Sequence, residues 1–238
     1  MTGNGSGRGT RRAAAAGHHG GMRSGDLTQV AAAGPQAAGV AGAGQRALAY
    51  PSERVIENPV SGERIVITVP AAETDGAVLG WELFLAPGGR VPSSHAHPRQ
   101  QEVFTVVSGR MRFRVSGRSR LLGPGETIAV GPRRVHSFAN AGPVTAHVLV
   151  ETKPALAMAE LLATAAAMAD GTQRTARLLP AIPRPHELIL FMRDFEQEVR
   201  APYLPAALVR ALTRPLAWLI RRCGLDTRYR QWRPRPAR

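Results

Sequence analysis

Cysteine, lysine and long apolar runs are almost absent from this sequence of 238 residues. With one cysteine, Cys223, the chain cannot form an internal disulfide, which suits a reducing compartment. No apolar run approaches the roughly 18 residues that a membrane-spanning helix needs. Arg11 and Arg12 precede a stretch of alanine, glycine and histidine that is too weakly apolar for an export signal. We therefore expect a cytoplasmic protein.

The near absence of lysine affects how the net charge of +14 is interpreted. Arginine supplies 30 of the 31 basic residues, a habit that suggests a GC-rich genome. The excess of positive charge is four over residues 1–50, three over 51–153 and seven over 154–238. A basic surface can attract nucleic acid or anionic lipid. Because no known nucleic-acid-binding motif accompanies the charge, we do not expect nucleic acid as a partner.

Residues 1–48 consist of glycine, alanine, serine and arginine with almost no large apolar side chains. Such a segment cannot bury enough apolar surface to offset the conformational entropy that ordering would remove. We expect a disordered tail there, in which His18 and His19 are solvated rather than metal-binding.

From residue 52 to residue 152 the pattern changes to short apolar segments separated by glycine and proline turns. The expected strands span residues 54–57, 63–69, 77–85, 102–107, 111–115, 127–130, 136–139 and 144–151. The fourth and fifth of these, joined by residues 108–110, are expected to form a hairpin. About nine short strands at this spacing predict a jelly-roll β-barrel with a ligand cavity at one mouth.

After residue 154 the apolar spacing changes to the helical period. The expected helices span residues 155–169, 186–200 and 205–222. Gly171 is the predicted C-cap of the first helix, and Pro215 should kink or break the third. Residues 228–238 should be loose. The chain thus divides into a disordered tail (1–48), a β-barrel (52–152) and a helical extension (154–238).

Three histidines and one glutamate of the β region form a candidate metal centre. His95 and His97 are two residues apart, so on a strand both side chains point to the same face. Glu102 follows after a short polar turn, and His136 comes from a later segment. Three imidazoles and one carboxylate suit an octahedral first-row metal ion with positions left for water or substrate. The candidate ions are Fe, Mn, Ni, Co, Zn and Cu, and the pattern does not choose among them.

These residues lie in a pattern that resembles the two sequence motifs of the cupin superfamily. Gly89, His95, His97, Glu102 and Gly109 match the first motif, G-x5-H-x-H-x3-4-E-x6-G. Gly125, His136 and Asn140 match the second, G-x5-P-x-G-x2-H-x3-N, with Gly131 in place of its proline and Arg133 in place of its inner glycine. The two departures lie in the turn and not among the ligands.

The resemblance covers residues 52–152 and implies the barrel fold and metal binding by all four residues. It implies a single-domain cupin with a helical C-terminal extension, similar to small bacterial cupins of unassigned function. Cupins commonly pair through their barrels, so the resemblance also implies a homodimer. It does not identify the reaction, because cupins include dioxygenases, isomerases, epimerases, decarboxylases, storage proteins and sensory domains.

Several further side chains are candidates for the surroundings of the metal. Phe104 and Phe138 share strand parity with the ligands Glu102 and His136 and are expected to line the cavity. Asn140 is expected to fix the turn after His136 through hydrogen bonds from its side chain to the backbone.

A second acid or base beside the metal would help to identify a reaction. Glu82 is expected to be an exposed carboxylate, and Arg99 and Gln101 are expected to be solvated residues of the turn before Glu102. His186 is expected on the surface of a helix. No catalytic residue is therefore predicted.

The helix expected over residues 205–222 is amphipathic and basic. It could lie on an anionic membrane, but packing against the outer sheet of the barrel or a second subunit is favoured. Two functions stay open. The first is a mononuclear metalloenzyme acting on a small organic molecule, a dioxygenase if the ion is iron and an isomerase or lyase if it is Mn or Zn. The second is a non-catalytic module that binds a metal or small ligand and whose helices form a dimer or partner interface.

Overall fold

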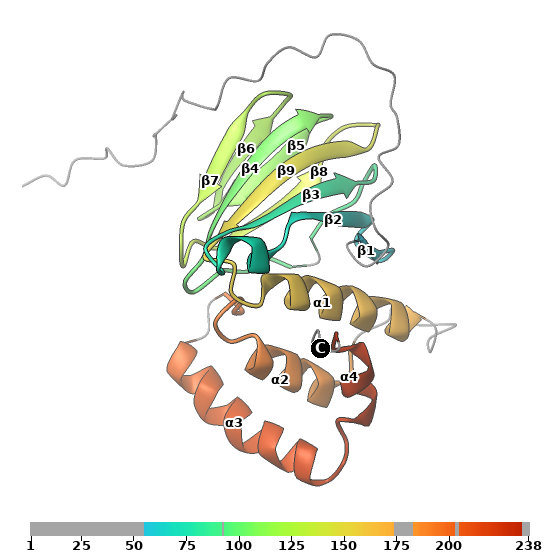
Figure 1. Cartoon of the computed structure of the whole chain (residues 1–238), viewed down its shortest axis with the longest axis vertical. Helices are drawn as coiled ribbons and strands as arrows, with labels where there is room; N and C mark the ends of the chain where they lie inside the picture. Colours follow the sequence, from blue (N-terminus) through green and yellow to red (C-terminus); the bar gives the residue numbers. More distant parts are fainter. Residues whose placement is uncertain (1–54, 92, 174–182, 203–204, 235–238) are drawn as a thin grey trace, which may run out of the picture. The chain divides into compact units, whose positions relative to one another are not determined.

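The structure is a computed structural model that describes residues 55–91, 93–173, 183–202 and 205–234. It confirms a mainly β fold followed by C-terminal helices (Figure 1). The strands are β1 (Val55–Asn58), β2 (Glu63–Val69), β3 (Leu79–Leu85), β4 (Gln101–Ser108), β5 (Met111–Val115), β6 (Arg118–Leu122), β7 (Thr127–Val130), β8 (His136–Asn140) and β9 (Ala146–Lys153), with a 3-10 turn, η2 (Ala71–Thr74), after β2. The tail expected over residues 1–48 lies outside the described residues.

The strands form two antiparallel sheets that pack into a sandwich (Figure 1). One sheet has the order β1-β2-β3-β9-β4-β7, and the other has the order β6-β5-β8. Alternate side chains of each strand point inward, as Leu79, Trp81, Leu83 and Leu85 do on β3. The core therefore lies between the two sheets, where strands of both can present side chains to a common site.

The predicted hairpin between residues 102–107 and 111–115 is wrong. β4 pairs with β7 and β9, whereas β5 pairs with β6 and β8. The chain passes from one sheet to the other at Gly109, which has a φ of 83° and approaches Ala146 so closely that a Cβ would lie 2.7 Å from its Cα. Phe104 and Phe113 then pack across the sandwich with ring centroids 5.1 Å apart. A short glycine turn between two alternating segments fits a hairpin and a sheet crossing equally well, and inter-sheet packing selects the crossing.

Strand β6 was not among the segments identified from the sequence. Four of its five residues are exposed and only Leu122 is buried, so it has no apolar alternation. It lies at the edge of the three-stranded sheet, where such a polar strand is common.

The helices are α1 (Met158–Gln173), α2 (Pro185–Asp194), α3 (Ala206–Arg222) and α4 (Thr227–Trp232). The extension is part of the same core as the barrel, because Met158, Leu161 and Phe195 are buried in one cluster with the inward side chains of the strands. A second, smaller core joins the helices through Met168, Leu190, Ala217, Ile220 and Tyr229.

Two predictions about the helical extension are wrong, and the packing of α4 explains both. Gly171 lies inside α1 rather than capping it, and Trp232 packs so closely on it that a Cβ would lie 2.8 Å from the indole. The segment expected to be loose from residue 228 contains α4, whose Tyr229 is buried. Arg233 lies 4.7 Å from the ring centroid of Phe195. These aromatic contacts order a segment whose composition alone favoured disorder.

Helix α3 runs without a break through Pro215. It packs mainly against α2, where Ala217 and Ile220 are its buried residues. No helix in the described part of the chain is long and apolar enough to cross a membrane.

Candidate metal centre

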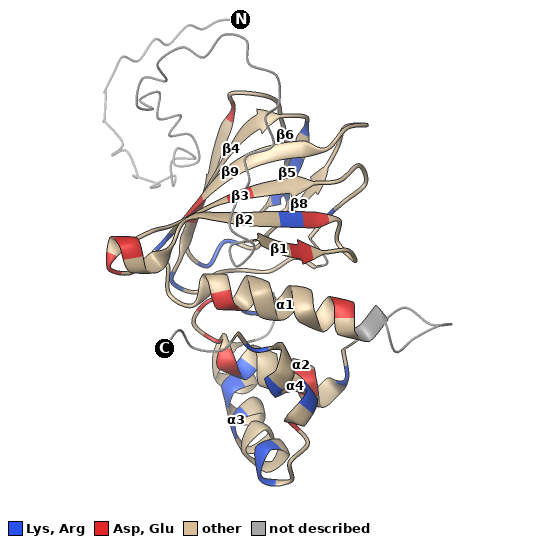
Figure 2. Cartoon of the chain, turned by 45° about the vertical axis from the view of Figure 1, so that its right-hand side comes forward, with Lys and Arg blue, Asp and Glu red and all other residues tan. Residues whose placement is uncertain are grey.

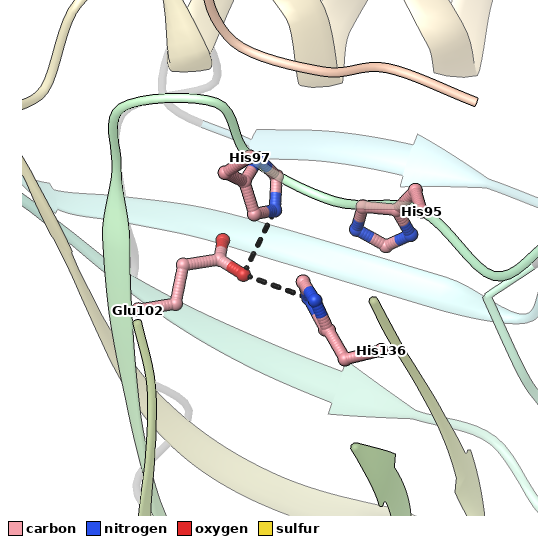
Figure 3. Close-up of side chains that lie close together, drawn as sticks. All are labelled: His95, His97, Glu102 and His136. Carbon is pink, nitrogen blue, oxygen red and sulfur yellow. Dashed lines mark hydrogen bonds and ion pairs between the residues drawn. The ribbon is translucent and has the colours of Figure 1, made fainter. Parts of the chain in front are cut away.

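The four predicted ligands come from both sheets and meet between them. His95 and His97 lie in the connection from β3 to β4, Glu102 is the second residue of β4, and His136 is the first residue of β8. One ligand atom from each lies within 4.8 Å of the others (Figure 3). The structure thus brings together all four side chains that the sequence singled out.

The distances between the ligand atoms match those around a single ion. Oε2 of Glu102 lies 3.0 Å from Nε2 of His97 and 3.2 Å from Nε2 of His136 (Figure 3). The ring centroids of His95 and His136 are 4.4 Å apart, and those of His95 and His97 are 5.0 Å apart. Atoms bonded to one ion at about 2.1 Å are about 3 Å apart when they are neighbours in the coordination sphere.

Hydrogen bonds to the backbone select the tautomer of each neutral imidazole. Nδ1 of each histidine faces a carbonyl oxygen: that of Ser93 at 3.2 Å from His95, that of Glu198 at 2.5 Å from His97, and that of Arg134 at 3.1 Å from His136. A carbonyl can only accept a hydrogen bond, so each Nδ1 must carry the proton and donate it. The neutral ring then has its lone pair on Nε2, the usual arrangement of a metal-binding histidine.

With this assignment, the centre contains only acceptors. The lone pairs on Nε2 of His97 and His136 face the carboxylate oxygen of Glu102. Nε2 of His97 is buried and has no hydrogen-bond partner. Buried acceptors that converge without a donor are unfavourable unless a cation lies between them. The residues present therefore fit a bound metal ion.

The electrostatics also favour a cation at this point. Burial, together with the neighbouring His136 and His97, lowers the pKa of His95 to about 3, so this imidazole is neutral. Burial alone would raise the pKa of Glu102, but His97 and His136 outweigh it and hold the pKa well below its usual value. Burial alone would lower the pKa of His97, but Glu102 outweighs it and raises the pKa. A negative carboxylate thus attracts positive charge, which a divalent ion can supply.

Backbone hydrogen bonds align the two segments that carry the histidines. His95 and His136 exchange both N–H···O bonds, at 3.0 and 2.8 Å. The amide of Arg133 donates to the carbonyl of His97 at 2.7 Å. Arg133, which occupies the position of a glycine in the motif that the sequence resembles, has a φ of 62°. The turn therefore keeps its left-handed residue despite the substitution, although an L residue there costs about 1–2 kcal/mol.

The helical extension reaches the site through the segment that follows α2. Besides the bond from His97 to the carbonyl of Glu198, the backbones of Ala96 and Arg200 exchange hydrogen bonds at 3.3 and 3.0 Å. The buried carboxylate of Glu198 accepts from the amide of Ala157 at 3.1 Å. No pattern in the sequence indicates this role, because Glu198 is 101 residues away from His97 and belongs to no motif.

Burial determines from which side the centre can be reached. His97, Glu102 and His136 are at most 4% exposed, and only His95 of the four is partly exposed. Phe104 and Phe138, which were expected to line a cavity, are buried in the core, and the Phe104 ring centroid is 6.4 Å from that of His136. Phe104 and Phe138, whose ring centroids are 5.6 Å apart, therefore form an apolar wall on the buried side of His136, and of the four side chains only His95 reaches solvent.

Other sequence candidates lie outside the cluster. Arg99 donates to the side chain of Gln197 at 2.8 Å, and Gln101 is exposed. His186 is half-buried on α2. The expectation of an exposed Glu82 is wrong, because Glu82 is half-buried and bonded at 2.8 Å to His147, whose ring stacks on Phe84. Cross-strand pairing with β9, which the sequence does not reveal, covers this carboxylate.

Asn140 has the role predicted for it. Its Nδ2 donates to the carbonyls of Leu85, Ala86 and Val144 at 2.7 to 3.1 Å, and its Oδ1 accepts from the amide of Gly142 at 2.8 Å. These bonds fix the end of β8, the strand that begins with His136.

Comparison with known proteins identifies the family of the β domain. Residues 81–151 match the family described as "Cupin domain", so the chain contains a cupin domain, followed by C-terminal helices. It is 39% identical over 87 residues to germin-like protein 3-8 of rice (Oryza sativa subsp. japonica). That stretch is 34% of this chain and 38% of the rice protein, so the chain spans about two-fifths of the length of this relative.

Two solved structures resemble the chain over part of its length. The structure of KdgF from Halomonas sp. has a TM-score of 0.38 and 19% identity, and the match covers 43% of this chain and 87% of that one. A cupin described as RmlC-like, from Shewanella frigidimarina, has a TM-score of 0.37 and 21% identity, over 44% of this chain and 88% of that one.

Proposed function

We propose that His95, His97, Glu102 and His136 bind one divalent metal ion and that the cupin domain is a mononuclear metalloenzyme for a small organic molecule. The observation that carries the proposal is the commitment of all three Nδ1–H groups to backbone carbonyls. It leaves three Nε2 lone pairs and a carboxylate to converge on one point.

A bound ion would supply a Lewis acid and a template for the substrate, with dioxygen chemistry accessible if the ion is iron. The residues of the chain do the rest. Glu102 supplies the negative charge that offsets the charge of the ion, and the wall of Phe104 and Phe138 keeps water from the buried side. The partial exposure of His95 supports substrate entry from that side.

A non-catalytic module that binds a metal or small ligand is the second candidate, and one observation favours it. The carboxylate of Glu198, close to His97, contributes to the raised pKa of that imidazole. This carboxylate is already bonded to the amide of Ala157. A binding module needs no general acid or base beside the metal, whereas many enzymes do.

Turnover distinguishes the two candidates. The metal-loaded protein is incubated with a panel of enols, thiols and flavonoid-like compounds, and oxygen consumption and product formation are followed. An enzyme gives turnover that Glu102→Gln abolishes and that the control Glu82→Gln retains, because Glu82 bonds to His147 outside the cluster. Silence of the fully loaded wild-type protein across the panel would favour the binding module.

A further inference from the structure

Helix α3 exposes a continuous stripe of leucines. Leu208, Leu212, Leu216 and Leu219 follow one another at spacings of four, four and three residues, which places them on one face of the helix. They are 49%, 56%, 43% and 50% exposed. Trp218 is 66% exposed. Single exposed apolar residues are normal on a protein surface, but a contiguous apolar stripe marks an interaction site.

The rest of the helix surface divides into a packed face and a basic face. Ala217 and Ile220 are buried in the small core shared with α2. The charged residues of α3 are Arg210, Arg214, Arg221 and Arg222, and the helix contains no aspartate or glutamate (Figure 2). Arg221 pairs with Asp194, whereas Arg210, Arg214 and Arg222 form no ion pair with the described residues. The helix therefore has apolar surface and positive charge without partners.

We propose that α3 lies in the interfacial plane of an anionic lipid bilayer, with its leucine stripe toward the acyl chains and Trp218 at the level of the headgroups. An amphipathic helix with arginine on its polar side and leucine on its apolar side is the pattern of interfacial helices. Its 17 residues extend over about 26 Å, enough for the four leucines to act together. Since no described helix can cross a membrane, this contact is peripheral.

Charge favours a bilayer over a second copy of the chain as the occupant. Two copies pairing through the leucine stripe would cover the leucines, but each would bring the same basic helix without an acid of its own. Anionic headgroups supply the missing negative charge and attract arginines that lie near such a surface. The proposal does not depend on metal binding, because α3 contributes none of the four ligands.

Sedimentation with lipid vesicles tests the proposal in the full-length protein. We expect binding to phosphatidylcholine vesicles that contain 30% phosphatidylglycerol, weaker binding as salt is raised, and no binding to pure phosphatidylcholine. Trp218 is the exposed one of three tryptophans, since Trp81 is buried and Trp232 is half-buried. Its fluorescence should shift to the blue with anionic vesicles, and Trp218→Phe should abolish that shift.

Two matched pairs of variants locate the contact. Leu212→Asn/Leu216→Asn should reduce the affinity for anionic vesicles at least tenfold, whereas Leu121→Asn on exposed β6 should not change it. Arg210→Gln/Arg214→Gln should weaken binding, whereas Arg112→Gln/Arg114→Gln on the exposed side of β5 removes the same charge from the barrel and should not. The thermal melt of each variant verifies that it is folded.

Three results would overturn the proposal. The first is no binding to anionic vesicles by the folded wild-type protein. The second is equal loss of binding in the barrel and the helix arginine variants, which would mean that the net charge alone binds lipid. The third is a dimer, measured by light scattering, that Leu212→Asn/Leu216→Asn dissociates, which would make a second copy the occupant of the stripe.

Discussion

At the scale of single residues, the ability of the cluster to bind a cation depends on which nitrogen of each histidine carries a proton. The three Nδ1 atoms donate to backbone carbonyls, so neutral rings direct lone pairs at one another and at Glu102. In the metal-free protein the converging lone pairs and the carboxylate lie close together without a cation between them. The lowered pKa of His95 keeps that ring neutral, and the raised pKa of His97 favours a proton on that ring. Metal binding then has to compete with a proton on His97, so the affinity for metal should fall as the pH falls.

The lowered pKa of His95 gives a pH prediction for the metal-free protein. Its pKa is about 3 in the folded chain and about 6.5 in the unfolded chain, so between these values the unfolded state binds the extra proton. The contribution of His95 to stability is therefore present above pH 6.5 and is lost as the pH falls toward 3. His97 has a raised pKa and the opposite sign, so its contribution is lost as the pH rises.

The variant His95→Gln separates the contributions of His95 and His97 to the pH dependence of stability. We expect the free energy of unfolding of wild-type protein, relative to His95→Gln, to be lower at pH 5 than at pH 7 in urea titrations of metal-free protein. A relative stability that stays constant or rises on going to pH 5 would contradict the lowered pKa of His95.

Arg133 gives a second prediction at this scale. Its φ of 62° is unfavourable for an L residue by about 1–2 kcal/mol, while glycine adds about 0.4–1 kcal/mol of unfolded-state entropy. Arg133→Gly should therefore raise the free energy of unfolding by up to about 1.6 kcal/mol. The neighbouring Arg134→Gly, at a residue without a positive φ, should lower it. If Arg133→Gly destabilises as much as Arg134→Gly, the left-handed turn is not present.

At the scale of elements, the segment after α2 completes the surroundings of His97. Glu198 is positioned by its carboxylate on Ala157, and its own carbonyl orients the imidazole. Such outer contacts commonly contribute 10- to 100-fold to metal affinity. Glu198→Ala should weaken metal binding by about this factor in calorimetric titrations.

Two controls make this test specific. Glu198→Gln keeps an oxygen for the amide of Ala157 and should retain most of the affinity. Glu196→Ala removes a carboxylate two residues away that pairs with Arg193, and should have no effect. Unchanged affinity in Glu198→Ala would show that the extension does not position the ligand.

The helices and strands also show which features can be predicted from the sequence and which cannot. Strand parity and motif spacing predicted the four residues of the cluster and the role of Asn140, because each depends on local order along the chain. The sheet crossing at Gly109, the packing of Gly171 on Trp232 and the role of Glu198 depend on contacts between distant segments. Local patterns do not determine such contacts.

At the scale of the whole molecule, one chain carries two sites of different chemistry, a buried cluster and an exposed helix face. The buried cluster of His95, His97, Glu102 and His136 carries the negative charge of Glu102, whereas α3 is basic and apolar. The extension connects them, since α2 packs against α3 and the segment that follows α2 bonds to His97. The net charge of +14 is thus not a property of the metal site, where a carboxylate dominates.

Elemental analysis of the purified protein tests the central claim most directly. The wild-type protein, reconstituted anaerobically if necessary, should contain about one first-row metal ion per chain. The double variant His95→Ala/His136→Ala should contain none. His147→Ala, which removes a histidine bonded to Glu82 outside the cluster, should retain it. No stoichiometric metal in the wild-type protein, or equal metal in the double variant, would contradict the account.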